Sequence, residues 1–239
     1  MPSAAVKRIL SKDMKAVQRN ELNKNGIYIE FNEDDITEAY AMIIGPEGSC
    51  YEDGFLYFKI NFPSNYPYSP PKVLYLSRGS IRIHPNLYTG RAQENFLGKV
   101  CLSLLGTWSG PQWTTIMDIT SILLSIQSLL TDDPIKQEPG YGNSSGSLNI
   151  RYNACINYET FRTLILKNSF DPPTKYECFQ ETIKNHLDMN KDRIVKKYSK
   201  LSKNKICQNA INISVYHISL KMNYEDLLAK FKEKIEYIE

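Results

Sequence analysis

The segment between residues 26 and 76 constrains the fold most, because four short runs of β-branched and aromatic residues alternate there with turn-forming residues. The clearest turns are Gly45-Pro46-Glu47-Gly48 and Glu52-Asp53-Gly54, whose residue types favour chain reversal. Short links between successive strands favour antiparallel pairing, since a parallel pair needs a long crossover. The predicted strands are Ile27–Phe31, Ala39–Ile44, Phe55–Asn61 and Val73–Leu76, and we expect them to form a four-stranded antiparallel meander.

Helical spacing of apolar residues flanks this sheet on both sides. Val6, Leu10, Met14 and Val17 predict a helix at the start of the chain. After an irregular stretch from Ile81 to Trp113, helical spacing returns over residues 116–130, with Thr114 or Thr115 as the expected cap. Further helices are predicted over Leu148–Asn168, over Thr174–Lys200 and after a cap at Asn223, and the alternation of Ile211, Ile213 and Val215 indicates a short strand.

This order of elements predicts an α+β fold in which the helices are segregated from the sheet. The length of 239 residues accommodates one domain of ordinary size and a smaller companion. We expect the main domain to cover residues 1–170 and a mostly helical C-terminal extension to cover residues 171–239.

Composition and charge exclude several classes of protein. Hydrophobic residues make up 42% of the chain and charged residues 23%, as in ordinary globular proteins. No apolar run reaches the roughly 20 residues of a membrane span, and no apolar stretch of signal-peptide length follows the basic N-terminus. We therefore expect no membrane partner and a cytoplasmic or nuclear location.

The positive charge lies in the C-terminal part of the chain. Residues 1–150 hold 13 Lys and Arg against 15 Asp and Glu, whereas residues 151–239 hold 16 against 11. Nucleic-acid faces interleave aromatic residues with basic ones, and only Tyr198 lies in the most basic segment, 184–205. We interpret the segment as the solvated face of a helix and expect no nucleic-acid partner.

The chain has five widely spaced cysteines. The odd number, and the lack of any CxxC or Cys/His cluster, predict neither a disulfide framework nor a metal site. Cys101 differs from the others because it stands in a Gly-rich irregular stretch, and long irregular stretches in compact domains are usually functional. We expect its thiol to be accessible to bulky partners. The five are Cys50, Cys101, Cys155, Cys178 and Cys207.

An ordered series of motifs runs through and before this stretch: YPYSPP at residues 66–71, His84-Pro85-Asn86, GKVCL at residues 98–102, and Trp113. With the GPEG and YEDG turns, these motifs resemble the ubiquitin-conjugating enzymes. The run CLSLLGTWSGPQW from Cys101 and the tetrapeptide EPGY from Glu138 are similar to the Z-type conjugating enzymes and to the catalytic domain of the giant inhibitor-of-apoptosis conjugating enzyme.

The resemblance implies a ubiquitin-conjugating fold and a carrier activity. An activating enzyme would place ubiquitin, or a ubiquitin-like modifier, on Cys101 as a thioester, and the chain would pass it to a substrate lysine or a ligase. A thiol suits both steps, because a thiolate is a good nucleophile and a fair leaving group. No metal or organic cofactor is implied, since the upstream activating enzyme consumes the ATP.

The resemblance also assigns roles to three residues of the HPN motif. Asn86 would stabilise the oxyanion of the transfer step, although its amide can equally brace the loop. His84 and Pro85 would structure that loop.

An acid is expected near the cysteine, because the incoming lysine, with a reference pKa of about 10.4, must lose a proton before it attacks. In the family this acid precedes a proline after the central helix, and Glu138 matches that position. Asp132 and Asp133 are rival candidates, and ordinary solvation of a helix end is the alternative for all three.

The partner surfaces rest on the resemblance alone. Lys7 and Arg8 would meet the activating enzyme. Tyr68, Trp113, Thr114 and Thr115 would meet a ligase. Solvated charge and aromatic packing are the simpler interpretations of these positions.

The chain departs from the family pattern at three points. Asn86 and Cys101 are further apart than is usual, and the additional residues, within 88–96, should bulge from the surface beside the thiol. Ser103 stands where many members have an acidic residue, which puts intrinsic lysine reactivity in doubt. Thr115 replaces the usual proline, which puts the ligase contacts in doubt.

Two other functions were weighed. A cysteine protease with a Cys101–His84 dyad is disfavoured, because no third group orients the histidine. The main alternative is a non-catalytic module of the same fold that holds ubiquitin or a ligase, which the presence of Cys101, Asn86 and an acid together disfavours.

Overall fold

The computed structural model describes residues 3–144 and 146–236. The chain divides into two compact units, each formed by segments that are separate in the sequence. The first comprises Met1–Ile44, Leu56–Ser77 and Asn86–Leu130, and the second comprises Gly45–Phe55, Arg78–Pro85 and Thr131–Glu239. The division at residue 170 expected from the sequence remains a prediction.

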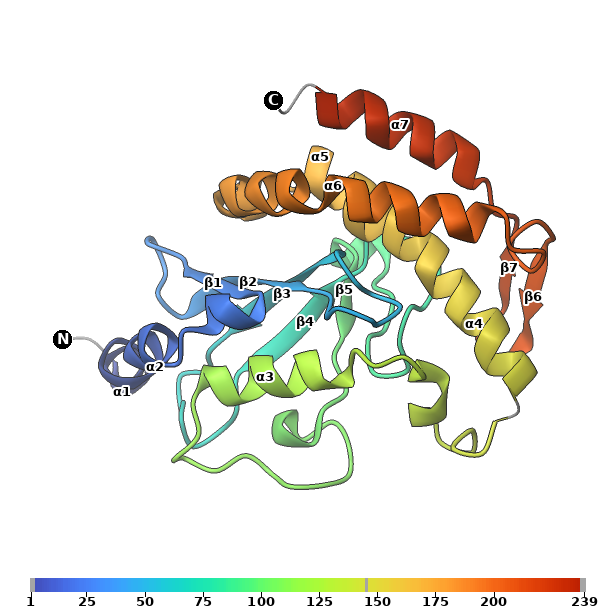
Figure 1. Ribbon diagram of the computed structural model, residues 1–239. Helices are drawn as coiled ribbons and strands as arrows, with labels where there is room; N and C mark the ends of the chain where they lie inside the picture. The colour runs from blue at the N-terminus through green and yellow to red at the C-terminus, as the bar shows by residue number, and fades with distance from the viewer. Residues whose placement is uncertain (1–2, 145, 237–239) are drawn as a thin grey trace. The chain divides into compact units, whose positions relative to one another are not determined.

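A five-stranded sheet with the strand order of the sequence dominates the first unit (Figure 1). The four predicted strands are confirmed, and β1 pairs with β2, β3 with β4 and β4 with β5 in antiparallel fashion. The strands are β1 (Ile27–Phe31), β2 (Glu38–Ile44), β3 (Phe55–Asn61), β4 (Lys72–Leu76) and β5 (Leu97–Lys99).

The fifth strand was missing from the prediction, because three residues are too few to show alternation. In β5, Gly98 pairs with Tyr75 of β4. A Cβ at Gly98 would lie 1.7 Å from the carbonyl oxygen of Tyr88, so only glycine fits here. This close approach brings residues 86–88 alongside residues 99–101, with Leu87 bridged to Val100.

The first unit has a segmented N-terminal helix and one central helix. The predicted N-terminal helix is confirmed as α1 (Ala4–Arg8), a π-helical turn over Ile9–Asp13, and α2 (Met14–Arg19). The central helix α3 spans Ile119–Leu129. Its cap is Asp118, whose carboxylate accepts the N–H of Thr120 at 3.1 Å. The expected cap at Thr114 or Thr115 is therefore wrong, because a cap must immediately precede the first helical turn.

A buried hydrogen-bonded cluster joins the YPYSPP segment to both helical regions. The Tyr66 phenol donates to Oδ1 of Asp13 at 2.6 Å, and the same oxygen accepts the N–H of Ile119 at 2.9 Å. The Trp113 indole donates to the Pro67 carbonyl at 2.7 Å, and its ring centroid lies 5.9 Å from that of Tyr66. The peptide bond between Tyr66 and Pro67 is cis.

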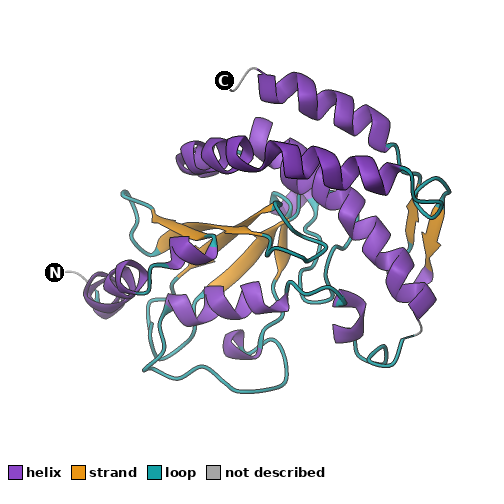
Figure 2. Cartoon of the chain, viewed as in Figure 1, coloured by secondary structure: helices purple, strands orange, loops and turns teal. Residues whose placement is uncertain are grey.

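Helices form most of the second unit (Figures 1 and 2). The predicted helices are confirmed, and the first two of them include irregular turns. The first is α4 (Gly146–Glu159), which continues through a π-helical stretch (Thr160–Lys167) into α5 (Asn168–Phe170). A 3₁₀ turn, Thr174–Phe179, precedes α6 (Gln180–Ser202), and the last helix is α7 (Tyr224–Glu236). Asn223 caps α7 as predicted, accepting the N–H of Asp226 at 3.2 Å.

Aromatic packing holds these helices together. The Phe161 ring stacks on Tyr198 of α6 with centroids 4.0 Å apart, and it lies 5.7 Å from the ring of Phe231 in α7. All three side chains are fully buried. The predicted short strand is β6 (Ile211–Ile213), which pairs antiparallel with β7 (Ile218–Leu220). Val215 is not part of the strand but of the turn between β6 and β7.

A charged cluster ties α6 to the turn between β2 and β3. Arg193 bonds to Asp53 at 2.6 Å and also pairs with Glu52, whose carboxylate accepts from Lys197 at 2.8 Å. His186 lies 2.9 Å from the same oxygen of Asp53. Among the described residues, no helix is long and apolar enough to cross a membrane.

Candidate functional site

Asn86 and Cys101 are joined by a reciprocal pair of hydrogen bonds in the first unit. The backbone N–H of Cys101 donates to the Asn86 carbonyl at 2.8 Å. The Asn86 side-chain amide donates to the Cys101 carbonyl, also at 2.8 Å, across 15 positions of sequence. The N–H of Tyr88 continues the ladder by donating to the Lys99 carbonyl at 3.0 Å. The HPN segment and the cysteine segment therefore form one braced structure despite the inserted residues.

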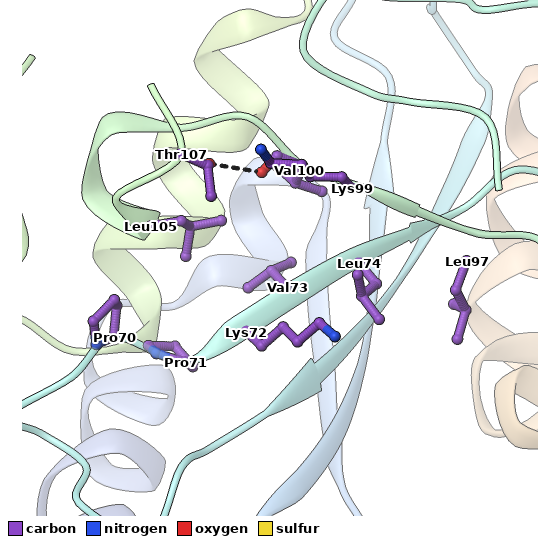
Figure 3. A pocket seen from close by; sticks show the side chains of 10 residues that line it. All are labelled: Pro70, Pro71, Lys72, Val73, Leu74, Leu97, Lys99, Val100, Leu105 and Thr107. Atoms are coloured by element: carbon purple, nitrogen blue, oxygen red, sulfur yellow. Dashed lines mark hydrogen bonds between the residues drawn. The ribbon is translucent and has the colours of Figure 1, made fainter. Parts of the chain in front are cut away.

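The loop after Cys101 is closed by Thr107. Its hydroxyl oxygen accepts the N–H of Leu102 at 2.9 Å and lies 2.9 Å from the Val100 carbonyl oxygen (Figure 3). A 3₁₀ turn over Ser103–Leu105 fills the space between. These hydrogen bonds fix the backbone on both sides of Cys101. A side chain is placed precisely when the backbone that carries it is fixed.

A cavity of about 590 Å³ lies beside this loop (Figure 3). Its apolar wall includes Pro71, Val73 and Leu105, and its lining reaches Val100, the residue before Cys101. Lys72 and Lys99 are the charged residues of the lining.

The Cys101 side chain is not open, contrary to the sequence-based expectation. The residue is only 3% exposed, and Asn86 is 4% exposed. A glycine-rich sequence without periodic apolar residues predicts that long helices and strands are absent. It does not predict that the side chains of the segment are exposed. Here the backbone bonds to Asn86 and the turn closed by Thr107 make the segment compact.

The other four cysteines are weaker candidates for two different reasons: three have raised pKa values, and the fourth lies outside the motifs. Burial raises the pKa of Cys50 to about 12 and that of Cys155 to about 12. Burial also raises the pKa of Cys207. A thiol with a raised pKa has little thiolate at neutral pH and reacts slowly. Cys178 is exposed and lies far from the conjugating-enzyme motifs in sequence.

The residues around the inserted segment are exposed, as expected. Tyr88, Thr89, Arg91 and Phe96 all lie at the surface. The segment is anchored at its base, because the Gly90 N–H donates to the Ser77 hydroxyl at 2.7 Å.

Glu138 lies in the second unit, directly after a 3₁₀ turn formed by Pro134–Gln137. It is half-buried, and its Oε2 accepts a hydrogen bond from the phenol of Tyr216. Its rival Asp133 accepts from Lys136 at 2.6 Å and from Asn149, and these hydrogen bonds lower the pKa of Asp133. A lowered pKa makes Asp133 a weaker base than an ordinary aspartate. The other rival, Asp132, is exposed.

His84 and Pro85 close a segment of the second unit that is held at several points. His84 is fully buried, and its ring lies 6.2 Å from that of Tyr51. The Tyr51 phenol donates to the Ile83 carbonyl at 2.7 Å. The Arg82 guanidinium donates to the carbonyls of His84 and Pro85. These contacts are those of a structural segment, in keeping with the role that the resemblance implied.

The residues expected to meet an activating enzyme differ in their contacts. Lys7 is exposed. Arg8 is partly buried and donates to the carbonyl of Met117 at 2.5 Å and to that of Thr115 at 3.3 Å. Arg8 thus also braces the segment before α3.

The residues expected to meet a ligase are mostly at the surface. Tyr68 is 80% exposed, and Thr114 and Thr115 are exposed. Trp113 is half-buried and bonded to Pro67, which is the packing role weighed as its simpler interpretation.

The sequence did not indicate three residues that contact the candidate site residues or close the loop after Cys101. They are Arg82, Thr107 and Tyr216. Thr107 lies within the CLSLLGTWSGPQW run, but its residue type gave no reason to single it out, and Arg82 and Tyr216 lie in none of the motifs. Among residues 3–144 and 146–236, no group of His, Cys, Asp and Glu is arranged to hold a metal ion.

Comparison with known protein families agrees with the motifs and the sheet. The family model described as "Ubiquitin-conjugating enzyme" matches residues 9–150. This match covers more than half of the chain, so the chain belongs to the ubiquitin-conjugating enzyme family. Its α+β fold, with a five-stranded sheet and a helical C-terminal region, is the fold expected for that family.

Individual relatives include the Z-type enzymes. "Ubiquitin-conjugating enzyme E2 Z" from Homo sapiens is 39% identical over 148 residues, which is 59% of this chain and 38% of the human protein. The protein of the same name from Xenopus tropicalis is 39% identical over 143 residues, 59% of this chain and 44% of its own length. "Putative ubiquitin-conjugating enzyme E2 38" from Arabidopsis thaliana is 38% identical over 189 residues, 73% of this chain and 54% of its own. The matched region is thus less than half of the E2 Z relatives.

Proposed function

We propose that this chain is an active conjugating enzyme that carries ubiquitin, or a ubiquitin-like modifier, as a thioester on Cys101. The observation that supports the proposal is the reciprocal bonding of Asn86 and Cys101, which keeps the HPN amide next to the cysteine across a lengthened loop.

In the loading step, the Cys101 thiolate attacks the carbonyl carbon of the modifier's thioester on the activating enzyme. A new C–S bond forms, the old C–S bond breaks, and the activating enzyme's thiolate leaves. Because Cys101 is only 3% exposed in the chain alone, this step requires a rearrangement that uncovers the sulfur. We propose that contact with the activating enzyme or the modifier drives it.

In the transfer step, the nitrogen of a substrate lysine attacks the thioester carbonyl. The C–N bond forms, the C–S bond breaks, Cys101 leaves as a thiolate, and the proton of the amine passes to Glu138. The Asn86 amide would stabilise the oxyanion of the intermediate, for which a single donor is worth about 3–4 kcal/mol. Its bond to the Cys101 carbonyl shows that it also braces the loop.

A second candidate function is a non-catalytic module of the same fold that binds ubiquitin or a ligase. The burial of Cys101 favours this candidate. The presence of the cysteine, the asparagine and an acid at the family positions favours the enzyme.

The test is a charging assay with activating enzyme, ATP and a panel of modifiers. We expect an adduct that reducing agent removes, and Cys101→Ser should convert it to an oxyester that reducing agent leaves intact. Cys178→Ser, which removes the exposed thiol, is the matched control and should charge like the unchanged chain. A labile adduct on the Cys101→Ser variant would move the site elsewhere, and no adduct with any modifier would support the binding module.

The partners proposed are the activating enzyme, the modifier, a ligase and a protein substrate. Tyr68, Thr114 and Thr115 support a ligase surface because they are exposed next to the bonded Trp113. A cytoplasmic or nuclear location also stays a proposal.

A further inference from the structure

The C-terminal region contributes a side chain that contacts the candidate acid. Tyr216 lies 78 positions after Glu138 and donates its phenolic O–H to Oε2 of that carboxylate. The family model matches residues 9–150, so Tyr216 lies outside the residues that this model matches. Both residues belong to the second unit.

A rigid support holds the phenol. Tyr216 ends the 3₁₀ turn between β6 and β7. The hairpin is paired from Ile211 and Leu220 to Ile213 and Ile218, and these four side chains are buried. The Arg151 guanidinium in α4 donates to the backbone carbonyl of Asn212 in β6. A side chain on a packed hairpin is placed more precisely than one on a free loop.

A second set of contacts fixes the ring of Tyr216. The Arg82 guanidinium lies over the ring, 4.8 Å from its centroid, which is a favourable cation–π distance. The Tyr152 ring lies 5.6 Å away, and its phenol donates to the Arg82 carbonyl at 2.8 Å. Because Arg82 also donates to the carbonyls of His84 and Pro85, one connected set of contacts runs within the second unit from Glu138 through Tyr216 and Arg82 to these two carbonyls.

We propose that Tyr216 is a positioning residue for Glu138 in the transfer step, an inference that rests on the proposed function. A glutamate has three rotatable side-chain bonds, and a hydrogen bond to one oxygen removes much of that freedom. Tyr216 keeps its own proton and holds Oε2, so that Oε1 is the oxygen that takes the proton of the attacking amine.

The test separates loading from transfer. The chain is charged with modifier, the activating enzyme is quenched, and the thioester is discharged with free lysine over a range of concentrations. Tyr216→Phe removes only the hydroxyl and should load normally. We expect it to slow discharge at saturating lysine by about tenfold, a modest part of the 10²–10⁴-fold that a positioned base supplies, with little change in the half-saturating lysine concentration.

A double substitution distinguishes positioning from a general structural effect. In a Glu138→Gln background, Tyr216→Phe should slow discharge no further, because the group that it positions has gone. Tyr28→Phe is the matched control: it removes a hydroxyl from the half-buried Tyr28 of β1 and should discharge normally. Urea unfolding of each variant shows whether the hairpin remains folded.

Each outcome has one meaning. Normal discharge by Tyr216→Phe, or an equal slowing with and without Glu138→Gln, overturns the positioning role while the proposed function stands. Failure of the unchanged chain to load with any modifier overturns both.

Discussion

Asn86 and Cys101 exchange two hydrogen bonds of 2.8 Å, one from the side-chain amide of Asn86 and one from the backbone N–H of Cys101. Both residues are almost fully buried. The same amide is thus both a brace for the cysteine and the expected donor to the oxyanion, and the two roles predict different consequences of its removal.

Asn86→Ala should lower the free energy of unfolding by about 1–3 kcal/mol, because it leaves the buried Cys101 carbonyl without this donor. If the amide also serves the oxyanion, discharge per folded molecule should fall by about 10²–10³-fold. Urea unfolding and single-turnover discharge measure the two effects. Asn209→Ala, which removes an exposed amide bonded to the Lys205 carbonyl, is the control and should change neither. Reduced stability with normal discharge would leave bracing as the only role.

Asp13 should make stability depend on pH in an unusual direction. Burial raises its pKa above the ordinary value of 3.8 despite its bond to Tyr66. Between 3.8 and the raised value the folded chain binds more protons than the unfolded chain, so this contribution to stability falls as pH rises through that window. We expect the unfolding free energy of the unchanged chain, relative to Asp13→Asn, to decrease as pH increases across it.

Asp35 offers the opposite case for comparison. Its hydrogen bonds from the Thr37 side chain and backbone lower its pKa, so its contribution is present above 3.8 and is lost as pH falls through the lowered value. In a pH series that extends below 3.8, the unfolding free energy of the unchanged chain relative to Asp35→Asn, measured by urea unfolding, should therefore increase as pH rises. For Asp13, the contrary result is a difference in unfolding free energy between the unchanged chain and Asp13→Asn that does not change with pH. It would show that the pKa of Asp13 is the same in the folded and the unfolded chain.

The cysteines should react with an alkylating reagent in a fixed order. Cys178 is the exposed cysteine and should be labelled first. Cys50 and Cys155, with pKa values raised to about 12 by burial, should be labelled only on unfolding. Cys101, at 3% exposure, should be slow in the isolated chain and faster when the activating enzyme is present. Mass spectrometry of timed samples gives the order, and labelling of Cys101 as fast as Cys178 in the isolated chain would show that its sulfur is open in solution.

Arg193 should matter to the stability of the second unit. It pairs with Asp53, which is 1% exposed, and with Glu52. Arg193→Met leaves a buried carboxylate with less compensation, and since the Arg193 side chain is 39% exposed, we expect a loss below the roughly 3–5 kcal/mol of a fully buried pair. Urea unfolding measures it.

The matched control for Arg193 is Lys230→Met, which breaks the exposed pair with Asp226. Solvent screens exposed pairs, which therefore contribute little to stability, so this variant should stay close to the unchanged chain. Equal losses in the two variants would show that the Arg193 cluster is no stronger than a surface pair.

Much of the fold could be predicted because its signals are local. The four longer strands, the N-terminal helix and the helices of the C-terminal region follow from apolar spacing and turn residues within windows of about ten residues. The three-residue β5 lies below the length at which alternation is visible. The cap of α3 was misplaced because Asp118 and the two threonines are all suitable cap types, and only the backbone shows where the first turn begins.

The site was predicted only as far as its motifs extend. Cys101, Asn86 and Glu138 were each selected from residue types in a family order, and their roles stay predictions; all three lie within the residues 9–150 that the family model matches. Burial of Cys101 was not predicted, because exposure depends on which distant segments cover a residue, and those contacts leave no local pattern.

The sequence by itself determined the class of fold and the family, and it supplied Cys101, Asn86 and Glu138 as candidates for thioester chemistry, since these depend on spacing and side-chain type along the chain. The tertiary structure alone decided that Asn86 is bonded to Cys101 across 15 positions and that Tyr216 is bonded to Glu138 across 78. Hydrogen bonds need atoms within about 3 Å in a favourable direction, and for residues so far apart only the folded chain sets that geometry.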